Sequence, residues 1–456
     1  MRHASTLQRL SAATAPFLAL QPERVEGRVN ALSGLAIDIA GLGAHVSLGD
    51  RVLLESRRGG TVSAEIVGFG GESTRAMAFG AMDGIGPGSA ALLTRGRGAA
   101  GLPVSNASLG RVVDPLGRPI DGKGALEPGP HQRNPRANPP DATTRARLGE
   151  RLETGVRVLD AFTTMRGGQR LGLFAGSGVG KSTLLSMLAR QTACDVAVIA
   201  LVGERGREVR EFLEDDLGPD GLARSVVVIA TSDAPPLQRR EAAYAAMTIA
   251  EHFRDQGKSV LLMMDSVTRF CLALREIGLS AGEPPATRGY PPSVFAELPR
   301  LLERAGPGPI LPGGRAGQIT GLFTVLVEGD DHNEPVADAV RGILDGHIVL
   351  DRKIGEAGRY PAVDVLRSLS RAVPGCHSPE ERDLTIRARR ILATYGDMED
   401  MIRLGAYRAG SDPAVDEAIA VMPALETFLR QAKGERSGLP QSFAALSAAL
   451  ETRNGP

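Results

Sequence analysis

The sequence predicts an α/β protein in three parts: a small N-terminal β-barrel, a central domain built on a parallel sheet and a C-terminal helical domain. Three observations predict this class. Short apolar runs separated by Gly-rich turns fill residues 25–94, apolar runs alternate with helical stretches through the middle, and apolar residues recur at helical spacing near the end. A chain of 456 residues is also too long for a single core.

The changes of pattern set the expected domain boundaries. We expect a terminal segment, the barrel, the central domain and the helical domain at residues 1–22, 23–95, 96–375 and 376–456. In the terminal segment Leu7 and Leu10 share a helix face, and Pro16 ends any helix. This segment is either a frayed end or a short helix that docks a partner.

Composition and charge indicate a globular protein with no electrostatic drive toward nucleic acid. The chain has 53 basic and 53 acidic residues, and 42% of its residues are hydrophobic. Its cysteines, Cys194, Cys271 and Cys376, lack the spacing of a zinc site and are expected to be reduced core thiols. No run reaches the roughly 18 apolar residues of a membrane span, and the run at 12–20 is too short for a signal peptide. A cytoplasmic protein is therefore expected.

The barrel is predicted from short strands with turns between them. The apolar runs cover residues 35–40, 51–56, 62–69, 76–79 and 90–93. Strands this short, at such regular spacing, are typical of a small closed barrel. No candidate catalytic residue falls among them, so the expected role of the barrel is to pack neighbours together.

Turn signatures at 110–122 and a stretch at 128–140 rich in Pro and Asn predict an extended connection into the central domain. The central domain then alternates apolar runs with helices expected at 207–217 and 238–255. The runs are rich in Val, Ile and Leu, as in parallel strands buried on both faces. They cover residues 171–175, 196–201, 225–230, 260–264, 319–327 and 348–350. Such a doubly wound sheet binds ligands at the carboxyl ends of its strands.

A phosphate-binding loop is predicted at residues 170–190, RLGLFAGSGVGKSTLLSMLAR, because a strand, a glycine-rich turn and a helix follow one another. Backbone N–H groups of the turn can converge on phosphate oxygens, Lys181 can reach the β and γ phosphates, and Ser182 can offer a hydroxyl to Mg²⁺. The strict pattern has Gly in place of Ala175. A glycine-rich turn that binds nothing is the alternative. The predicted nucleotide contacts are Ala175, Gly176, Ser177, Gly178, Val179, Gly180, Lys181, Ser182 and Thr183.

Carboxylates follow two further apolar runs. Glu204 follows Gly203, just after the run ending at Val202, and could hold the water that attacks the γ phosphate, whereas Glu208 and Glu211 lie further into the helix and point elsewhere. A solvated charge cluster is the alternative for Glu204. Asp265 ends the run LLMMD, where a carboxylate can hold Mg²⁺ through its water shell.

The end of the chain predicts helices. An Asp-Pro pair at 412–413 caps one helix, and Val415, Ile419 and Met422 then repeat at helical spacing. We expect this stripe to belong to the core rather than to a binding surface.

Four motifs in register resemble the ATP synthase α/β superfamily: AGSGVGKS, GERGREVREF, LLMMDSVTRF and PAVDVLRSLS. The resemblance covers about residues 25–430. Within the superfamily, GERGREVREF, the segment at 282–306 and TVLVEGDDHNEPVAD at 324–338 are most similar to the type III export ATPases, flagellar or virulence-associated. Ala at the first position of the loop is usual in those proteins. The resemblance implies a RecA-like central domain.

The resemblance also implies a homohexameric ring with ATP and Mg²⁺ bound between subunits. In that ring Glu204 matches the catalytic glutamate that activates water, and Arg205 matches a neighbouring phosphate ligand. Lys181 matches the phosphate-binding lysine, and Ser182 and Asp265 match the metal site.

Two further residues are matched downstream. Arg371 matches an arginine finger presented to the adjacent subunit, where a guanidinium would neutralise charge as the γ phosphate leaves. A salt bridge within one subunit is the alternative. Tyr360 matches a position near the adenine.

The resulting hypothesis is a Mg²⁺-dependent ATPase that drives type III protein export, with the flagellar system favoured over the virulence system. Implied partners are a stator protein, a central stalk protein, export gate membrane proteins, chaperones and export substrates, at the cytoplasmic side of the inner membrane; nucleic acid is not expected. Competing hypotheses are a rotary synthase catalytic subunit, a noncatalytic nucleotide-binding ring subunit and an RNA translocase. The segment at 282–306 and Ala175 disfavour the first, and Glu204 with Arg371 disfavours the second.

Overall fold

The computed structural model describes residues 25–71, 73–94, 101–127, 129, 132–176, 178–314, 316–327 and 334–451. The chain forms two compact units, one of residues 1–100 with 280–283 and one of residues 101–279 with 284–456. The predicted terminal segment at 1–22 lies outside the described residues. In the described part of the chain, no helix combines the length and apolar character needed to cross a membrane.

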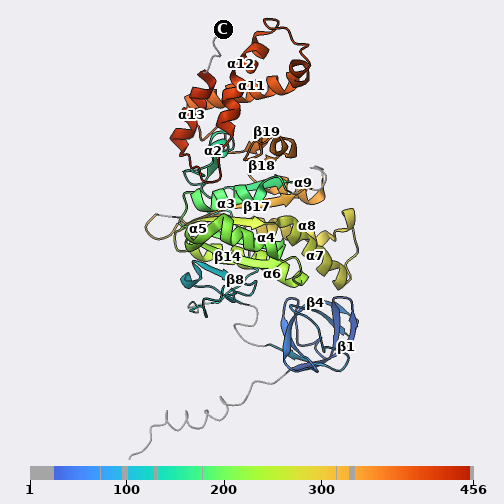
Figure 1. Ribbon diagram of the computed structural model, residues 1–456. Coiled ribbons are helices and arrows are strands. Elements are labelled where there is room, and N and C mark those ends of the chain that lie inside the picture. Colours follow the sequence, from blue (N-terminus) through green and yellow to red (C-terminus); the bar gives the residue numbers. More distant parts are fainter. Residues whose placement is uncertain are drawn as a thin grey trace, which may run out of the picture. The chain divides into compact units, whose positions relative to one another are not determined.

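The first unit is a closed β-barrel, as predicted (Figure 1). Its strands are β1 Glu26–Ser33, β2 Ala36–Ala40, β3 Arg51–Glu55, β4 Thr61–Gly70, β5 Ser73–Ala78 and β6 Ala90–Leu93. They pair in the order β1-β2-β5-β4-β3-β6. β1 was not among the predicted strands, because its buried residues are Gly27 and Val29, and a glycine adds nothing to an apolar pattern.

The second unit is built on a nine-stranded sheet. Its strands are β8 Arg111–Val113, β12 Arg170–Ala175, β13 Val196–Glu204, β14 Ser225–Thr231, β15 Ser259–Asp265, β16 Gly306–Pro307, β17 Gln318–Leu326, β18 Gly346–Leu350 and β19 Val363–Ser370. The order is β19-β18-β12-β17-β15-β13-β14-β8, with β16 paired beside β17. From β18 to β8 the strands are parallel, which confirms the prediction from the unbroken apolar runs.

The two edge strands of this sheet were not predicted. β8 lies inside the segment at 110–122, where only turns were expected, and it is too short to carry a periodic signal. β19 is antiparallel to β18 and mixes exposed with buried positions, so its sequence lacks an unbroken apolar run. Short two-residue strands complete the unit, with β7 Leu102–Pro103 paired to β9 Gln132–Arg133 and β10 Arg151–Leu152 paired to β11 Met165–Arg166.

Helices cover both faces of the sheet, so the sheet is doubly wound as predicted. They are α2 Arg157–Phe162, α3 Lys181–Gln191, α4 Gly206–Glu211, α5 Gly218–Ala223, α6 Pro236–Arg254, α7 Val267–Ala281, α8 Pro292–Leu302, α9 Pro335–Ile343 and α10 Arg352–Glu356. Alternate residues of β13 enter two cores: Val198 and Ala200 pack with α6, α7 and α8, whereas Ile199 and Leu201 pack with α3. The helix expected at 207–217 is α4 continued by a π-helical turn, η2 Phe212–Leu217.

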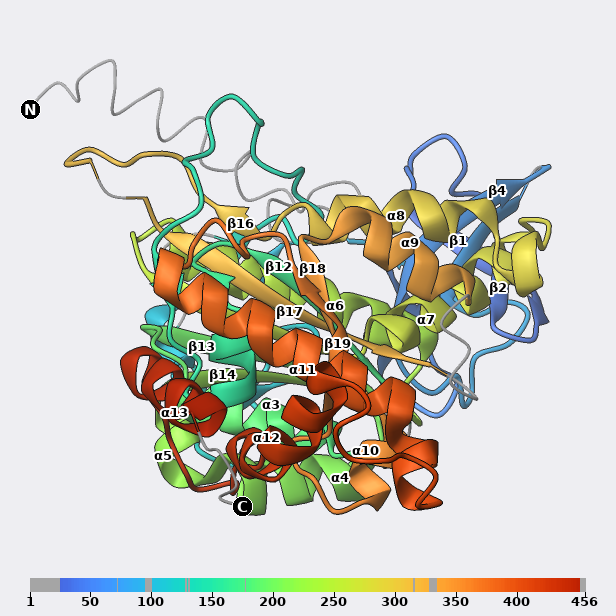
Figure 2. The ribbon, with the colours of Figure 1, turned by 90° about the horizontal axis from the view of Figure 1, so that it is seen from above.

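The end of the chain is helical, as predicted, with α11 Pro379–Arg403, α12 Pro413–Leu429 and α13 Leu439–Glu451 (Figure 2). Asp412 caps α12 through the backbone N–H of residue 414. The predicted stripe on α12 is displaced: Val415 is buried, but Ile419 and Met422 are only partly buried. Ala418 and Val421 are buried in their place, because small apolar residues define the buried face here.

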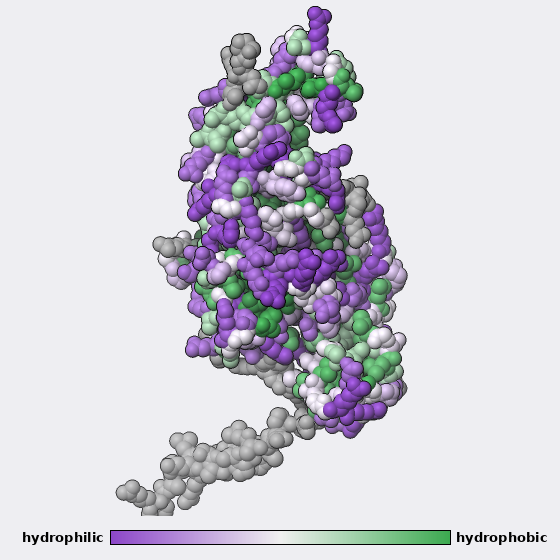
Figure 3. All heavy atoms as spheres, in the orientation of Figure 1, coloured by the Kyte–Doolittle hydropathy of each residue, from purple (hydrophilic) through white to green (hydrophobic). Residues whose placement is uncertain are grey.

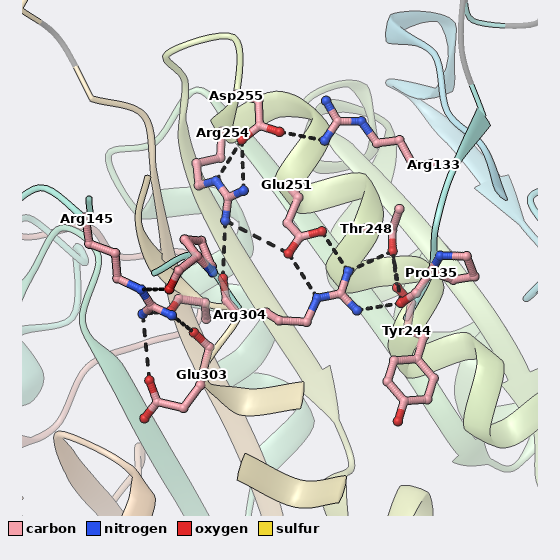
Figure 4. Close-up of polar contacts among 12 residues, drawn as sticks. Arg133, Pro135, Arg145, Tyr244, Thr248, Glu251, Arg254, Asp255, Glu303 and Arg304 are labelled. Carbon is pink, nitrogen blue, oxygen red and sulfur yellow. Dashed lines mark hydrogen bonds and ion pairs between the residues drawn. The ribbon is translucent and has the colours of Figure 1, made fainter. Parts of the chain in front are cut away.

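An extended connection, residues 132–146, runs against α6 and is held by arginine side chains (Figure 4). Arg304 is 1% exposed and donates to both carboxylate oxygens of Glu251, at 2.9 and 2.6 Å. The same guanidinium donates to the carbonyl oxygen of Pro135 at 2.5 Å. Arg145 donates in a similar way to the carbonyl of Pro140 at 3.0 Å. These donors give the carbonyls of Pro135 and Pro140 a partner, so the part of the connection after β9 can lie against the domain without a strand partner at these two residues.

Candidate active site

The glycine-rich turn joins β12 to α3 and leaves the start of α3 available to a ligand. No side chain caps α3, and Gly180 precedes it with a φ of 90°, a conformation that favours glycine. A Cβ at Gly180 would lie 3.1 Å from the ring of Tyr360, so the ring is held beside the turn. An anion at this end of α3 would meet unbonded N–H donors and the positive end of the helix dipole.

Most residues of the predicted loop line one cavity of about 600 Å³. They are Gly176, Gly178, Gly180, Lys181, Ser182 and Thr183. Ala175 and Val179 are instead buried, at 1% and 3% exposed, and do not line the cavity. Ser177 lies outside the described residues.

The ammonium of Lys181 lies between the carboxylates of two neighbouring strand ends. Its Nζ atom is 2.5 Å from Oδ1 of Asp265, which ends β15, and 3.2 Å from Oε1 of Glu204, which ends β13. The side chain of Glu204 is 16% exposed, so Glu204 is not part of a solvated charge cluster. Thr324, from β17, donates its hydroxyl to the same Asp265 oxygen at 2.7 Å and fixes that carboxylate.

These close contacts shift the proton affinities of the site. Burial and the nearby Asp265 carboxylate raise the pKa of Glu204 to about 7, although Lys181 acts in the opposite direction. Burial alone would lower the pKa of Lys181, but the two carboxylates outweigh burial and raise it. Two carboxylates thus share one ammonium, and Glu204 has a proton affinity suited to accepting a proton from water near neutral pH.

Gly203 aims Glu204 into the cavity. Its φ is 73°, and the pairing of β13 with β14 shifts register between residues 202 and 204. A Cβ at Gly203 would lie 2.9 Å from the Cβ of Arg269, so a larger residue would be both strained and crowded. The strand therefore ends in a turn that only glycine makes easily, and this turn points Glu204 toward Lys181.

Arg205 lies at the rim of the cavity rather than beside Lys181. It lines the cavity, but its side chain is 81% exposed and pairs with Glu208 at 3.3 Å. The polar residues of α4 continue this charged rim, which forms part of the purple band across the second unit in Figure 3. In this structure Arg205 is thus placed to approach a phosphate only after a side-chain rotation.

The structure adds cavity residues that were not predicted: Ser232, Arg269, Leu326, Val327 and Arg352. The expectation that Glu208 points elsewhere was wrong, because Glu208 lies in the first turn of α4 and lines the cavity. Ser232 directly follows β14 and Arg352 lies two residues after the end of β18, so the rule that ligands bind at the carboxyl ends of strands could have found them. Arg269 lies on α7, one turn after Asp265, and the sequence carried no such signal for it.

Arg371 lies at the opposite ends of the strands from the phosphate-binding loop. The backbone N–H of Arg371 donates to the carbonyl of Asp345, just before β18, whereas the loop follows the far end of β12, where Ala175 pairs with Leu350. β18 alone separates these ends by about 13 Å, at about 3.3 Å per residue. Among the described residues no ion pair or hydrogen bond to its guanidinium is present, so the alternative of an internal salt bridge finds no support there.

Oxygen donors suited to Mg²⁺ lie in the cavity. The Ser182 side chain lines it, and the hydrogen bonds from Lys181 and Thr324 to Asp265 both end on Oδ1. Among the described residues this leaves Oδ2 of Asp265 for a metal-bound water. Mg²⁺ prefers hard oxygen ligands and retains several waters, so this donor set fits it.

Comparison with known proteins bears directly on this site. A flagellum-specific ATP synthase of Caulobacter vibrioides is 54% identical over 434 residues, which cover 95% of this chain and 97% of the relative. The chain belongs to the ATP synthase alpha/beta family. The family models for its beta-barrel domain and its nucleotide-binding domain match residues 30–95 and 155–370. A third model, described as the T3SS EscN ATPase C-terminal domain, matches residues 377–448. These matches confirm the resemblance and the predicted fold class.

Other members of the ATP synthase alpha/beta family are similar over most of the chain. A flagellum-specific ATP synthase of Bacillus subtilis is 49% identical and covers 92% of this chain, with 94% of the relative matched. A type 3 secretion system ATPase of Xanthomonas euvesicatoria is 48% identical and covers 93%, with 94% of the relative matched. The solved structure of the assembled ATPase EscN from the enteropathogenic E. coli type III secretion system covers 93% of this chain and is itself fully covered, with a TM-score of 0.85 at 39% identity.

Proposed function

We propose that this chain is a Mg²⁺-dependent ATPase that drives type III protein export, in the flagellar system. The observation that carries the proposal is the position of Lys181 between Glu204 and Asp265, beside the uncapped start of α3. A phosphate bound at the start of α3 would then have a cation, a carboxylate of raised pKa and a carboxylate suited to hold a metal nearby. The similarity over nearly the whole chain to flagellum-specific relatives supports the export function.

The mechanism follows from these positions. ATP phosphates would bind the N–H groups at the start of α3, and Lys181 would move from the carboxylates onto the phosphate oxygens. Glu204, released from its ion pair, would hold the attacking water and accept its proton. Mg²⁺ held by Ser182 and, through water, by Asp265 would neutralise phosphate charge. Arg205 would turn inward to contact the γ phosphate, and Tyr360 would contact the adenine.

The site is completed by a second copy of this chain. Arg371 lies at the opposite end of β18 from the cavity of its own subunit, about 13 Å away along the strand, which is beyond the reach of its side chain. It follows β19, an edge strand whose Leu366 and Leu369 side chains are 47% and 52% exposed. Apolar side chains exposed on a sheet edge suit a subunit contact. We therefore propose a homohexameric ring in which Arg371 of each subunit acts in the site of its neighbour.

The wider assembly is proposed from the relatives. One solved structure shows EscN in complex with its central stalk EscO, and it matches this chain with a TM-score of 0.83 at 38% identity. A central stalk protein, a stator, export gate proteins, chaperones and export substrates are accordingly the proposed partners. The proposed location is the cytoplasmic side of the inner membrane, peripherally bound to the export apparatus.

A virulence secretion ATPase is the second candidate, favoured by the Xanthomonas relative. The two candidates can be separated genetically. The gene for this chain would be expressed in a Caulobacter vibrioides strain that lacks its own flagellum-specific relative. Restored motility supports the flagellar assignment, and stable expression without motility contradicts it.

Glu204→Gln tests the catalytic assignment. The amide keeps the size of the side chain but cannot accept the proton, so we expect nucleotide binding to persist and steady-state hydrolysis to fall by at least about a hundredfold. Glu211→Gln is the matched control, since Glu211 pairs with Arg207 on the exposed surface of α4. Unimpaired hydrolysis by Glu204→Gln would remove Glu204 from this role.

A further inference from the structure

A second, smaller cavity lies directly beside the nucleotide cavity. It has a volume of about 280 Å³ and is bordered by α7, the end of β17 and the turn η3 Thr287–Gly289. Three arginines line it, Arg269, Arg275 and Arg288, with one carboxylate from Glu334. We call it the arginine pocket. Among the described residues, cations therefore exceed anions on its walls, and the pocket is suited to an oxyanion.

The arginine pocket shares a wall with the nucleotide cavity. Arg269 and Leu326 line both cavities. The Nε atom of Arg269 is buried and has no hydrogen-bond partner among the described residues. Because a buried donor without a partner is costly, a rotation of the Arg269 side chain that brings this atom to an anion between the two cavities would relieve that cost. Thr268 accepts a hydrogen bond from the backbone N–H of Leu326 at 2.9 Å, which holds the shared wall in place.

Local structure fixes the other two arginines. The guanidinium of Arg275 lies 5.4 Å from the centre of the buried Tyr290 ring, and a Cβ at Gly289 would lie 2.9 Å from Arg275 Nη2. Stacking on a buried ring orients a guanidinium at low entropic cost. Arg288 has a φ of 48° in the exposed turn η3, an uncommon conformation for a residue with a side chain. The arginines thus lead from the nucleotide cavity, through Arg269 and Arg275, to Arg288 at the surface.

We propose that the arginine pocket binds the inorganic phosphate released by hydrolysis and conducts it from the catalytic cavity to solvent. The inference rests on the proposed ATPase function, which supplies the phosphate. A whole nucleotide does not suit the pocket, because its volume is less than half that of the adjoining cavity. A hydrated phosphate does suit it, since 280 Å³ corresponds to about nine water molecules at about 30 Å³ each. No bond forms or breaks in the pocket.

Phosphate binding can be measured while the catalytic phosphate positions are filled. The full-length protein would be loaded with Mg²⁺ and a non-hydrolysable ATP analogue and then titrated with inorganic phosphate in a calorimeter. The variants are Arg275→Gln and Arg288→Gln. Arg300→Gln is the matched control, because Arg300 lies on α8 in an exposed pair with Glu297, outside both cavities.

We expect Arg275→Gln and Arg288→Gln each to weaken phosphate binding by about ten- to a hundredfold, the range for a lost charge-assisted hydrogen bond. Arg300→Gln should match the wild type, and all variants should keep the wild-type affinity for the analogue. Phosphate binding that is absent in the wild type, or equal in the variants and Arg300→Gln, overturns the proposal. Parallel loss of phosphate and analogue binding also overturns it, since the arginines would then belong to the nucleotide site.

The outcomes separate this proposal from the proposed function. If the analogue does not bind, the ATPase assignment fails, but titration of the unloaded protein with phosphate still tests the pocket. If Arg275→Gln does not fold, Arg288→Gln decides the result, because Arg288 lies in an exposed turn.

Discussion

Replacing Arg304 by Met should strongly destabilise the second unit. Arg304 and Glu251 are almost fully buried, with side chains 1% and 7% exposed, and their closest atoms are 2.6 Å apart. Methionine has a similar length but no donors, so Glu251 loses its main partner and the carbonyl of Pro135 loses a donor. Breaking a buried ion pair by removing one partner costs about 3–5 kcal/mol, because an uncompensated charge remains buried.

Two companion variants separate charge from packing. Arg300→Met is the matched control, since Arg300 lies one turn before Arg304, has a side chain 63% exposed and pairs with Glu297, whose side chain is 30% exposed. It should change the free energy of unfolding by no more than about 0.5 kcal/mol. Arg304→Met combined with Glu251→Leu removes the buried charge as well and should recover a large part of the loss.

The assay is urea unfolding followed by circular dichroism, supported by limited proteolysis of the connection at residues 132–146. Cleavage there should accelerate in Arg304→Met, because the connection loses its hydrogen bond from Arg304 to the carbonyl of Pro135. An unfolding free energy within about 1 kcal/mol of that of Arg300→Met would refute the assignment of Arg304 and Glu251 as a buried, mutually dependent pair.

Two further predictions concern Glu204 and Gly203, the residue before it. The pKa of Glu204 in the folded state is about 7, above its ordinary 4.5, so its contribution to the free energy of unfolding is fully present below pH 4.5 and is lost as the pH rises through 7. The kcat/KM, which needs the ionised base, should instead fall about tenfold per pH unit below pH 7. A flat pH profile down to pH 5.5 would contradict this role of Glu204. Gly203→Ala should lower kcat and the melting temperature, because Gly203 has a left-handed φ and an added Cβ would clash with Arg269. Gly206→Ala is the control and should be neutral or slightly stabilising, since there is open space around Gly206. Equal behaviour of both variants would argue against a role for Gly203 in directing Glu204 into the cavity.

The parts of the fold with a strong local signal could be predicted from the sequence. Unbroken apolar runs predicted the parallel core strands, because burial on both faces leaves no polar positions. Strands without that signal were missed. β1 buries a glycine, β8 has three residues, and β19 is an edge strand with exposed positions, so each depends on its neighbours for its conformation.

The candidate site likewise combines residues that the sequence predicted with residues that it missed. Lys181, Glu204 and Asp265 lie at or after the ends of apolar runs, so the rule for ligand binding at strand ends predicts that they lie close together, as they do. Arg269 follows no run, and its side chain enters the cavity only because Gly203 leaves room for it. That relation depends on packing between β13 and α7, which no sequence spacing encodes.

The central claim is that each site is completed by Arg371 of a neighbouring copy, and mixing two inactive variants tests it most directly. Arg371→Ala and Lys181→Ala should each have little hydrolytic activity alone. In mixed rings, some interfaces contain an intact Lys181 opposite an intact Arg371, so hydrolysis should recover, with a maximum at intermediate mixing ratios. No recovery at any ratio, in rings shown by labelled subunits to have exchanged, would contradict a shared site.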